Sequence, residues 1–149
     1  MTEHAQFVTL GVADEIFAVP VGSVQEILET LPITPLPQAP ANLLGMVDVR
    51  GQTVPVVDLR LTLGLPARED TQSTRIVVLS LGGPSSPQHL GVRTDRVFEV
   101  TELDDGEMEP PATLNGQWTN HSIVGIGRRK GAFVTVVDFS RMIGGVLPR

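Results

Sequence analysis

Short apolar runs, separated by Gly, Pro and charged positions, follow one another along most of this chain of 149 residues. Alternation with a period of two and an abundance of β-branched residues are typical of strands. The pattern predicts strands at 6–12, 16–21, 43–49, 53–57, 75–81, 90–92, 97–101, 123–126 and 133–137. Because these strands are short and closely spaced and no long helical period interrupts them, we expect a mainly β fold built from small barrels.

Short helical segments are predicted at three places, each from a capping residue. Ser23 lies three residues before Glu26, which is the spacing of a capping box and predicts a single helical turn. Asp58 is the expected N-cap of a short helix that ends at Gly64, and Asp138 is the expected N-cap of a last short helix near the C-terminus.

Two segments are predicted to be connections. Residues 31–41 hold four prolines, which lack the N–H donors of a helix interior or a central strand. We expect an extended connection there that packs through Ile33 and Leu36. Residues 102–122 are predicted to form a long acidic loop, and since they lack the ligand spacing of a calcium-binding hand, we expect this loop to be solvated.

The stretch LLGMVDVRGQTVPVVDLRLTLG recurs 80 positions later as IVGIGRRKGAFVTVVDFSRMIG, a shift that places Gly51 on Gly131. An earlier block recurs with a shift of 73, which places Glu26 on Glu99. One domain over residues 1–149 is therefore predicted to contain two related units.

These internal units cover about residues 7–64 and 75–144. A unit of about 60–70 residues is marginal alone, so we expect the two to share an apolar interface. Whether each lobe uses only the strands of its own unit stays open, because strand exchange leaves no trace in the sequence.

Composition and charge limit the classes of function that the chain can have. An apolar fraction of 41% predicts a globular chain, and a net charge of −6 disfavours binding to nucleic acid. The absence of Cys excludes disulfides and thiolate metal sites and fits the cytoplasm. The N-terminus has no signal-peptide pattern, and no apolar run reaches the roughly 20 residues that span a bilayer, so we expect no direct membrane insertion.

No motif in the sequence indicates catalysis. Gly125 and Gly127, followed by Gly131, miss a dinucleotide fingerprint by one position, and a predicted hairpin stands where that motif needs a helix. No Gly-x-Ser-x-Gly elbow is present. None of the histidines has the i, i+4 helical pairing of a zinc site, and we expect exposed polar roles for His4, His89 and His121. We therefore predict no metal, no cofactor and no enzymatic activity.

A binding surface around Arg50 is the remaining candidate. The Arg50-Gly51 pair is predicted to form a hairpin tip, with Gly51 supplying a positive φ or a tight approach. An arginine at such a tip is either solvated or directed at a carboxylate, because its planar group suits bidentate pairing. Asp48 and Asp58 lie nearby in the sequence and are expected to hold it in place.

Val24 and Glu26, at the end of the predicted capping-box turn, belong to the same candidate surface. Each has an alternative role, a core position for the valine and a cap partner for the glutamate. The residues alone leave these alternatives open.

The order of FVTLGV, FAVPVGSVQEIL and ITPLPQAPANLLGMVDVRGQTVPVVDL resembles the CheW family of chemotaxis coupling proteins, and LGVRTDRVFEV and IVGIGRRKGAFVTVVDF are similar to its second half. The resemblance covers about residues 7–145, and its most specific block is 34–59. It implies two five-stranded β-barrels over a shared core, no catalysis and no cofactor. It also implies a cytoplasmic adaptor that links the CheA histidine kinase to the cytoplasmic tips of methyl-accepting chemoreceptors, in membrane-bound receptor arrays.

Carried over position by position, the resemblance implies partner-binding roles for Val24, Glu26, Gly45, Arg50, Gly91, Val97 and Val100. The receptor's helical hairpin is implied to enter a groove between the barrels, where apolar side chains meet its apolar stripe. The barrel ends are implied to pack against the regulatory domain of the kinase. Which valines face which partner stays open.

Two departures from the family pattern stand out. The usual Asn-Leu-Arg-Gly is Asp48-Val49-Arg50-Gly51 here, which keeps an acceptor and loses the amide donors. An aliphatic-Val-Asp sequence after Gly91 becomes Arg93-Thr94-Asp95, and we expect the added charge to alter a partner contact. A CheW-like barrel module of another pathway, such as surface or pilus-based motility, is the alternative function, and an enzyme with a carboxylate pair is the third.

Overall fold

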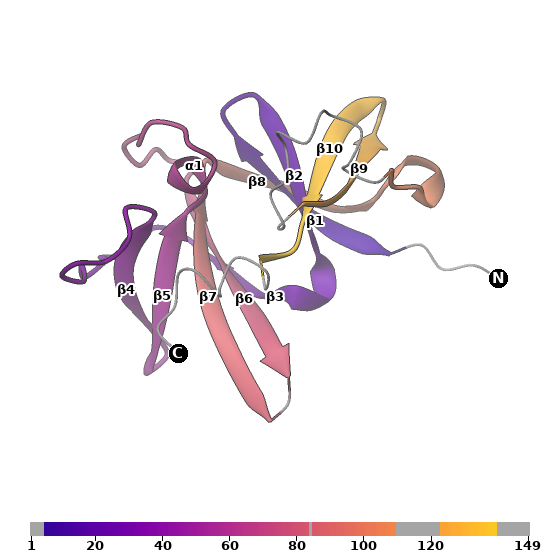
Figure 1. Cartoon of the computed structure of the whole chain (residues 1–149). Helices are drawn as coiled ribbons and strands as arrows, with labels where there is room; N and C mark the ends of the chain where they lie inside the picture. The colour runs from indigo at the N-terminus through magenta and orange to yellow at the C-terminus, as the bar shows by residue number, and fades with distance from the viewer. Residues whose placement is uncertain (1–4, 84, 110–122, 140–149) are drawn as a thin grey trace.

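The computed structural model describes residues 5–83, 85–109 and 123–139, which form two five-stranded sheets (Figure 1). Sheet A runs in the order β8 (Arg96–Glu102), β1 (Gln6–Val12), β2 (Glu15–Pro20), β10 (Ala132–Val137) and β9 (Ile123–Arg129). Sheet B runs in the order β3 (Val24–Leu28), β6 (Arg75–Gly83), β7 (Ser86–Thr94), β5 (Gln52–Asp58) and β4 (Leu43–Val49). Three short helical elements accompany them: α1 (Leu59–Thr62) and the 3-10 turns η1 (Val21–Ser23) and η2 (Asp104–Gly106).

Each sheet combines strands from both predicted sequence units. Figure 1 shows the early strands β1 and β2 beside the late strands β9 and β10, and β6 and β7 complete the sheet that holds β3, β4 and β5. If β3, β4 and β5 are replaced by the strands five places later, and β6 and β7 by the strands five places earlier, the order of sheet B becomes that of sheet A. The parallel pairs β2–β10 and β5–β7 are equivalent under this replacement. The two units therefore exchange strands, which the sequence leaves open.

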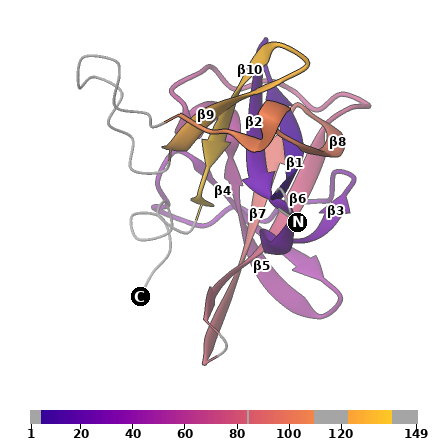
Figure 2. The same cartoon turned by 90° about the vertical axis from the view of Figure 1, so that its right-hand side faces the viewer.

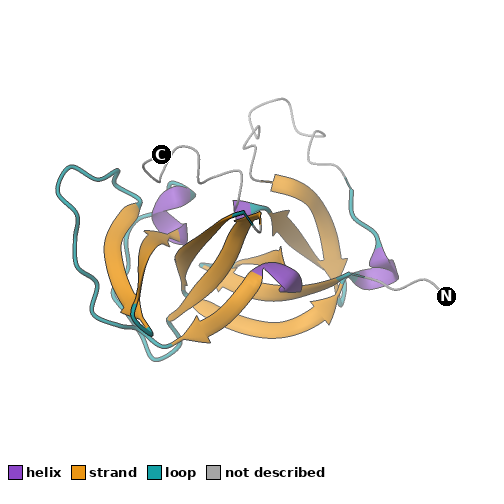
Figure 3. Ribbon diagram, turned by 90° about the horizontal axis from the view of Figure 1, so that it is seen from below, coloured by secondary structure: helices purple, strands orange, loops and turns teal. Residues whose placement is uncertain are grey.

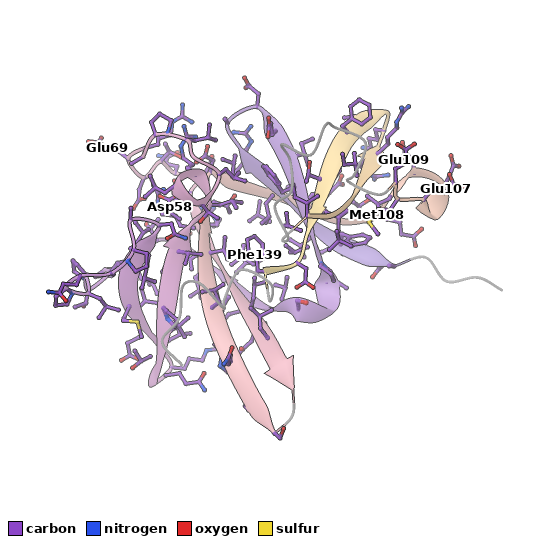
Figure 4. The ribbon with its side chains drawn as sticks, in the orientation of Figure 1. Asp58, Glu69, Glu107, Met108, Glu109 and Phe139 are labelled. Atoms are coloured by element: carbon purple, nitrogen blue, oxygen red, sulfur yellow. The ribbon has the colours of Figure 1, made fainter. Side chains whose placement is uncertain are left out.

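The core consists of three buried clusters. The largest lies between the two sheets and takes residues from both, such as Leu10 of β1 and Leu79 of β6, with Phe139 placed between the sheets in Figure 4. A second cluster, including Val54 and Ile76, lies within the lobe of sheet B, and a third, including Val134, lies within the lobe of sheet A. The prediction of a mainly β fold with two lobes that share an apolar interface is confirmed.

Both lobes are curled sheets whose edges are joined by a connecting segment. Strand pairing leaves β3 and β4 as the two edges of sheet B and β8 and β9 as the edges of sheet A. The segment after β3 reaches β4 through a bridge between Thr34 and Met46, and the segment after β8 reaches β9 through a bridge between Glu109 and Ile126. Figure 3 shows the curvature of the strands from below. The lobes are therefore barrel-like without a continuous ring of strand pairs.

The capping-box prediction at Ser23 is wrong. The turn η1 ends at Ser23, and Val24–Leu28 is the strand β3, in which Val24 faces Leu79 and Ile27 faces Val77 of β6. Pairing with a central strand satisfies the backbone of β3 and packs its apolar side chains, which outweighs a local capping signal.

The other expected elements are found with small shifts of their ends. Asp58 caps α1, since its Oδ1 accepts a hydrogen bond from the Arg60 N–H at 2.8 Å. In the proline-rich connection Ile33 packs against the sheet B cluster, whereas Leu36 is 39% exposed, so the predicted packing of Leu36 is wrong. The predicted helix after Asp138 and residues 110–122 of the acidic loop lie outside the described residues.

Candidate partner-binding site

The β4–β5 hairpin turns through Arg50 and Gly51, whose φ angles are 52° and 82°. Positive φ at both central positions is the mark of a type I′ turn, which matches the twist of the flanking strands. The Gly51 N–H donates to Asp48 Oδ1 at 3.0 Å, so Asp48 holds the turn backbone. The predicted positive φ of Gly51 is confirmed, and the turn presents the Arg50 side chain at 83% exposure.

The Arg50 guanidinium forms an ion pair with Glu26 of β3, with Nη2 and Oε1 3.4 Å apart. The pair joins the hairpin tip of β4 and β5 to the opposite edge of sheet B. Among the described residues, Glu26 is therefore the carboxylate that pairs with Arg50, in place of the expected Asp48 and Asp58. Because Arg50 is so exposed, the pair itself adds little stability, and most of its five N–H donors face solvent.

Gly45 and Gly91 are buried and act through close packing. A Cβ on Gly45 would lie 2.1 Å from the carbonyl oxygen of Thr34, and its φ of 147° disfavours other residues. A Cβ on Gly91 would lie 3.1 Å from methyl groups of Ile76 and Val56. Both glycines thus shape the lobe of sheet B and lie away from its surface.

The predicted valines lie on the edge strands β3 and β8. Val24 and Val97 are half-buried against the cluster between the sheets, whereas Val100 is 55% exposed. Phe98 beside them on β8 is 48% exposed, and Ile27 on β3 is 42% exposed. We call Val24, Ile27, Val97, Phe98 and Val100 the edge-strand apolar surface. Figure 2 shows β3 and β8 on the same side of the molecule.

Sequence reasoning missed Phe98, although a signal was present. Val97-Phe98 places two apolar residues in succession on a strand, so one of them has to face away from the core. Phe98 lies across β1 at Gly11, where a Cβ would come within 2.9 Å of its ring, and the Arg96 guanidinium lies 5.3 Å from the ring centroid. These contacts hold an exposed aromatic ring in a fixed place.

The β9–β10 hairpin is the counterpart of the Arg50 hairpin in sheet A. Lys130 and Gly131 have φ angles of 52° and 81°, and Arg129 pairs with Glu99 of β8 at 3.3 Å. Asp104 accepts hydrogen bonds from the Lys130 and Gly131 N–H groups, both at 3.0 Å. The bonds from Gly131 and Lys130 lower the pKa of Asp104 below its usual value of 3.8. Residues 105–109 of the acidic loop are exposed, as expected, and Asp104 in addition holds the neighbouring turn.

Arg93, the charged departure from the family pattern, is buried and paired within the chain. Its Nη1 donates to Asp58 Oδ2 at 3.1 Å, its Nη2 to Asp70 Oδ1 at 2.6 Å, and the same nitrogen to the Arg68 carbonyl oxygen at 2.7 Å. Figure 4 shows Asp58 beside α1. With a side-chain exposure of 7%, Arg93 is held inside the chain, so the expected effect of its charge on a partner contact stays a prediction and would act through the residues that it binds.

A second buried ion pair connects the two lobes. Arg60 of α1 donates to Asp95 Oδ2 at 2.7 Å, and the same oxygen accepts the N–H of Ala13 in the β1–β2 turn at 2.9 Å. One carboxylate thus ties the end of sheet B to a hairpin of sheet A. The position of Asp95 thus helps to fix the orientation of the two lobes relative to each other. The edge strands β3 and β8 are held in the same relative orientation.

The described part of the chain shows no group of three or more His, Cys, Asp or Glu placed to hold a metal ion. Of the three histidines only His89 falls within it, half-buried on β7, while His4 and His121 lie outside. No helix in the same residues is long and apolar enough to cross a membrane.

The CheW-like domain family matches residues 6–146, almost the whole chain. The chain belongs to the CheW family. It is similar to the chemotaxis protein CheW of Helicobacter pylori, with 30% identity over 142 residues, which cover 95% of this chain and 82% of the relative. It is also similar to the chemotaxis protein CheW of Rhizobium meliloti, with 28% identity over 146 residues, 93% of this chain and 92% of the relative.

Among solved structures, the chain is similar to the crystal structure of the scaffolding protein TtCheW from Thermoanaerobacter tengcongensis. The TM-score is 0.80 at 25% identity, and the match covers 91% of this chain and 90% of that one. Family membership confirms the prediction of a non-enzymatic adaptor of chemotaxis signalling.

Proposed function

We propose that this CheW-family adaptor joins the cytoplasmic tips of methyl-accepting chemoreceptors to the regulatory domain of a CheA-type histidine kinase. The observation that carries the proposal is the family match over residues 6–146, together with the likeness to a scaffolding protein at a TM-score of 0.80. In this proposal the chain works in the cytoplasm and reaches membrane-bound receptor arrays only through its protein partners.

The edge-strand apolar surface is the proposed contact with the receptor. A helical hairpin that presents an apolar stripe needs an exposed apolar surface, and clustered exposed side chains mark such sites. Val100 and Phe98 are about half exposed, while Val24 and Val97 anchor the same strands to the core. Phe98 and Val100 are therefore the side chains that we place directly against the receptor helices, and Val97 supports this contact from the core side.

The Arg50 hairpin is the proposed contact with the kinase. Glu26 holds the guanidinium from one side, and the exposed donors of Arg50 are free to bind a carboxylate or carbonyl group of the partner. Gly45 and Gly91 both pair with Val56, away from the hairpin tip, and shape the lobe by allowing its segments to pack closely. Their partner role is thus indirect.

A binding assay with matched variants tests these assignments. The purified chain is titrated with the regulatory domain of a CheA-type kinase from the same genome, with Arg50→Glu as the variant and Lys130→Glu at the equivalent turn as the charge-matched control. We expect Arg50→Glu to weaken binding by roughly tenfold or more and the control to bind like the parent. Val100→Asp, at an exposed position of the same strand, should leave kinase binding intact and weaken capture of receptor fragments.

Two results would contradict the assignments. A fall in thermal stability of Arg50→Glu that accompanies its loss of binding would make Arg50 a structural residue. If the parent chain bound no kinase of this type, a CheW-like module of another pathway, such as surface or pilus-based motility, would replace the proposed function.

A further inference from the structure

A hollow of about 350 Å³ lies where the parallel strands β2 and β10 begin side by side in sheet A. Its lining consists of Asp14, Glu15, Ile16, Ala132, Phe133 and Thr135. Phe133 is 65% exposed, the largest fraction among the exposed large apolar side chains of the described residues. Neither the edge-strand apolar surface nor the Arg50 hairpin contributes to this lining, so the hollow is a separate feature of the surface.

The lining of this hollow has an acidic part and an apolar part. Asp14 and Glu15 supply two exposed carboxylates, and neither forms an ion pair with another described residue. Ile16, Ala132 and the Phe133 ring supply the apolar part. An apolar floor beside a negative rim fits a side chain with an aliphatic stem and a cationic head, which describes lysine and arginine.

The Phe133 ring already accepts a guanidinium from its own chain. A second hollow, of about 330 Å³, also has Phe133 in its lining, together with Arg128 and carboxylates that include Asp105 and Glu107. There the Arg128 guanidinium carbon lies 4.8 Å from the ring centroid, which is a cation–π distance. The hollow beside Asp14 has no Lys or Arg of the described residues in its lining.

We infer that the hollow between β2 and β10 binds a lysine or arginine side chain of a basic segment of a partner protein. Charge complementarity selects this occupant, because the rim is negative and the ring attracts cations. The inference goes beyond the proposed receptor and kinase contacts and does not depend on them. It adds a docking position on the lobe of sheet A.

The test is an NMR titration of the isotope-labelled full chain with acetyl-Leu-Arg-Leu-amide. The matched probe is the same peptide with citrulline in place of arginine, which keeps the shape and removes the charge. We expect saturable shifts of the Ile16, Phe133 and Thr135 amides with the arginine peptide, with a dissociation constant on the order of millimolar. Binding of the citrulline peptide should be roughly tenfold weaker or absent.

Variants locate the binding. Glu15→Gln and Phe133→Ala should each reduce the affinity for the arginine peptide several-fold, and Glu69→Gln, an exposed carboxylate of the other lobe, should leave it unchanged. Equal binding of both peptides, shifts centred elsewhere, or no saturable shift would overturn the inference. Concentration-dependent shifts of these amides without peptide, abolished by Glu15→Gln, would overturn the assigned occupant in favour of a second copy of the chain.

Discussion

Two glycines of the β4–β5 hairpin show how single residues act in different ways. Gly51 has a φ of 82° and open space where a Cβ would stand, so only its backbone conformation requires glycine. Gly45 combines a φ of 147° with a Cβ position 2.1 Å from the Thr34 carbonyl oxygen. A side chain there would push away the segment that joins β3 to β4.

Replacing these glycines by alanine should therefore have unequal costs. We expect Gly51→Ala to destabilise the fold by about 1 kcal/mol, from left-handed strain alone. Gly45→Ala should cost about 3 kcal/mol or more, because steric overlap and the lost Thr34–Met46 bridge add to the strain. Urea unfolding of both variants measures the difference, and equal costs would contradict the packing role of Gly45.

At the scale of elements, each sheet has an ion pair between one edge strand and the type I′ hairpin that includes its other edge strand. Glu26 of β3 pairs with Arg50, and Glu99 of β8 pairs with Arg129. In sheet A the turn backbone is also held by Asp104, which follows β8. Glu26 and Glu99, which the shift of 73 places on each other, thus have equivalent partners in the two sheets.

The Asp104 contact makes the β9–β10 turn sensitive to acid. Its pKa in the folded chain lies below 3.8, chiefly because of the hydrogen bonds from Gly131 and Lys130. Because folding lowers this pKa, the stabilisation from the Asp104 hydrogen bonds is fully present above pH 3.8. It is lost as the pH falls through the pKa of Asp104 in the folded chain. The amide chemical shifts of Lys130 and Gly131 should therefore titrate with a midpoint below 3.8.

Asp104→Asn is the control for this titration. The asparagine cannot ionise, so the acid transition of both amides should disappear while the neutral-pH spectrum of sheet B is unchanged. A midpoint at or above 3.8 in the parent chain would contradict the assigned hydrogen bonds.

At the scale of the whole molecule, strand exchange makes the two lobes interdependent. Sheet A needs β8, β9 and β10 from the second half of the chain, and sheet B needs β3, β4 and β5 from the first. The cluster between the sheets and the Arg60–Asp95–Ala13 connection bind the lobes further. We therefore expect one cooperative unfolding transition, with the amide NMR signals of sheet A, those of sheet B and circular dichroism giving the same midpoint.

Asp95 gives a direct measure of the connection between the lobes. Asp95→Ala leaves the buried Arg60 without its carboxylate, and we expect a loss of about 3–5 kcal/mol in the free energy of unfolding. Glu99→Ala removes the exposed pair with Arg129 and should cost less than about 1 kcal/mol. Similar losses in the two variants would show that the Asp95 pair does not act as a buried one.

The sequence by itself determined nine of the ten described strands, the two hairpin tips, the cap at Asp58 and the family, because hydrophobic alternation and turn chemistry are local signals. It also supplied the candidate site residues, whose partner roles stay predictions. Glu26 and Arg50 were both named from the sequence, yet only the structure showed that they pair.

Only the tertiary structure decided which strands share a sheet, that Val24–Leu28 is a strand, and that Arg93 is buried between Asp58 and Asp70. The exposure of Phe98 and the hollow beside Phe133 were also decided only by the tertiary structure. The physical reason is common to all of them: the choice of a pairing partner depends on hydrogen bonds and burial between segments far apart in the chain, which no local pattern records.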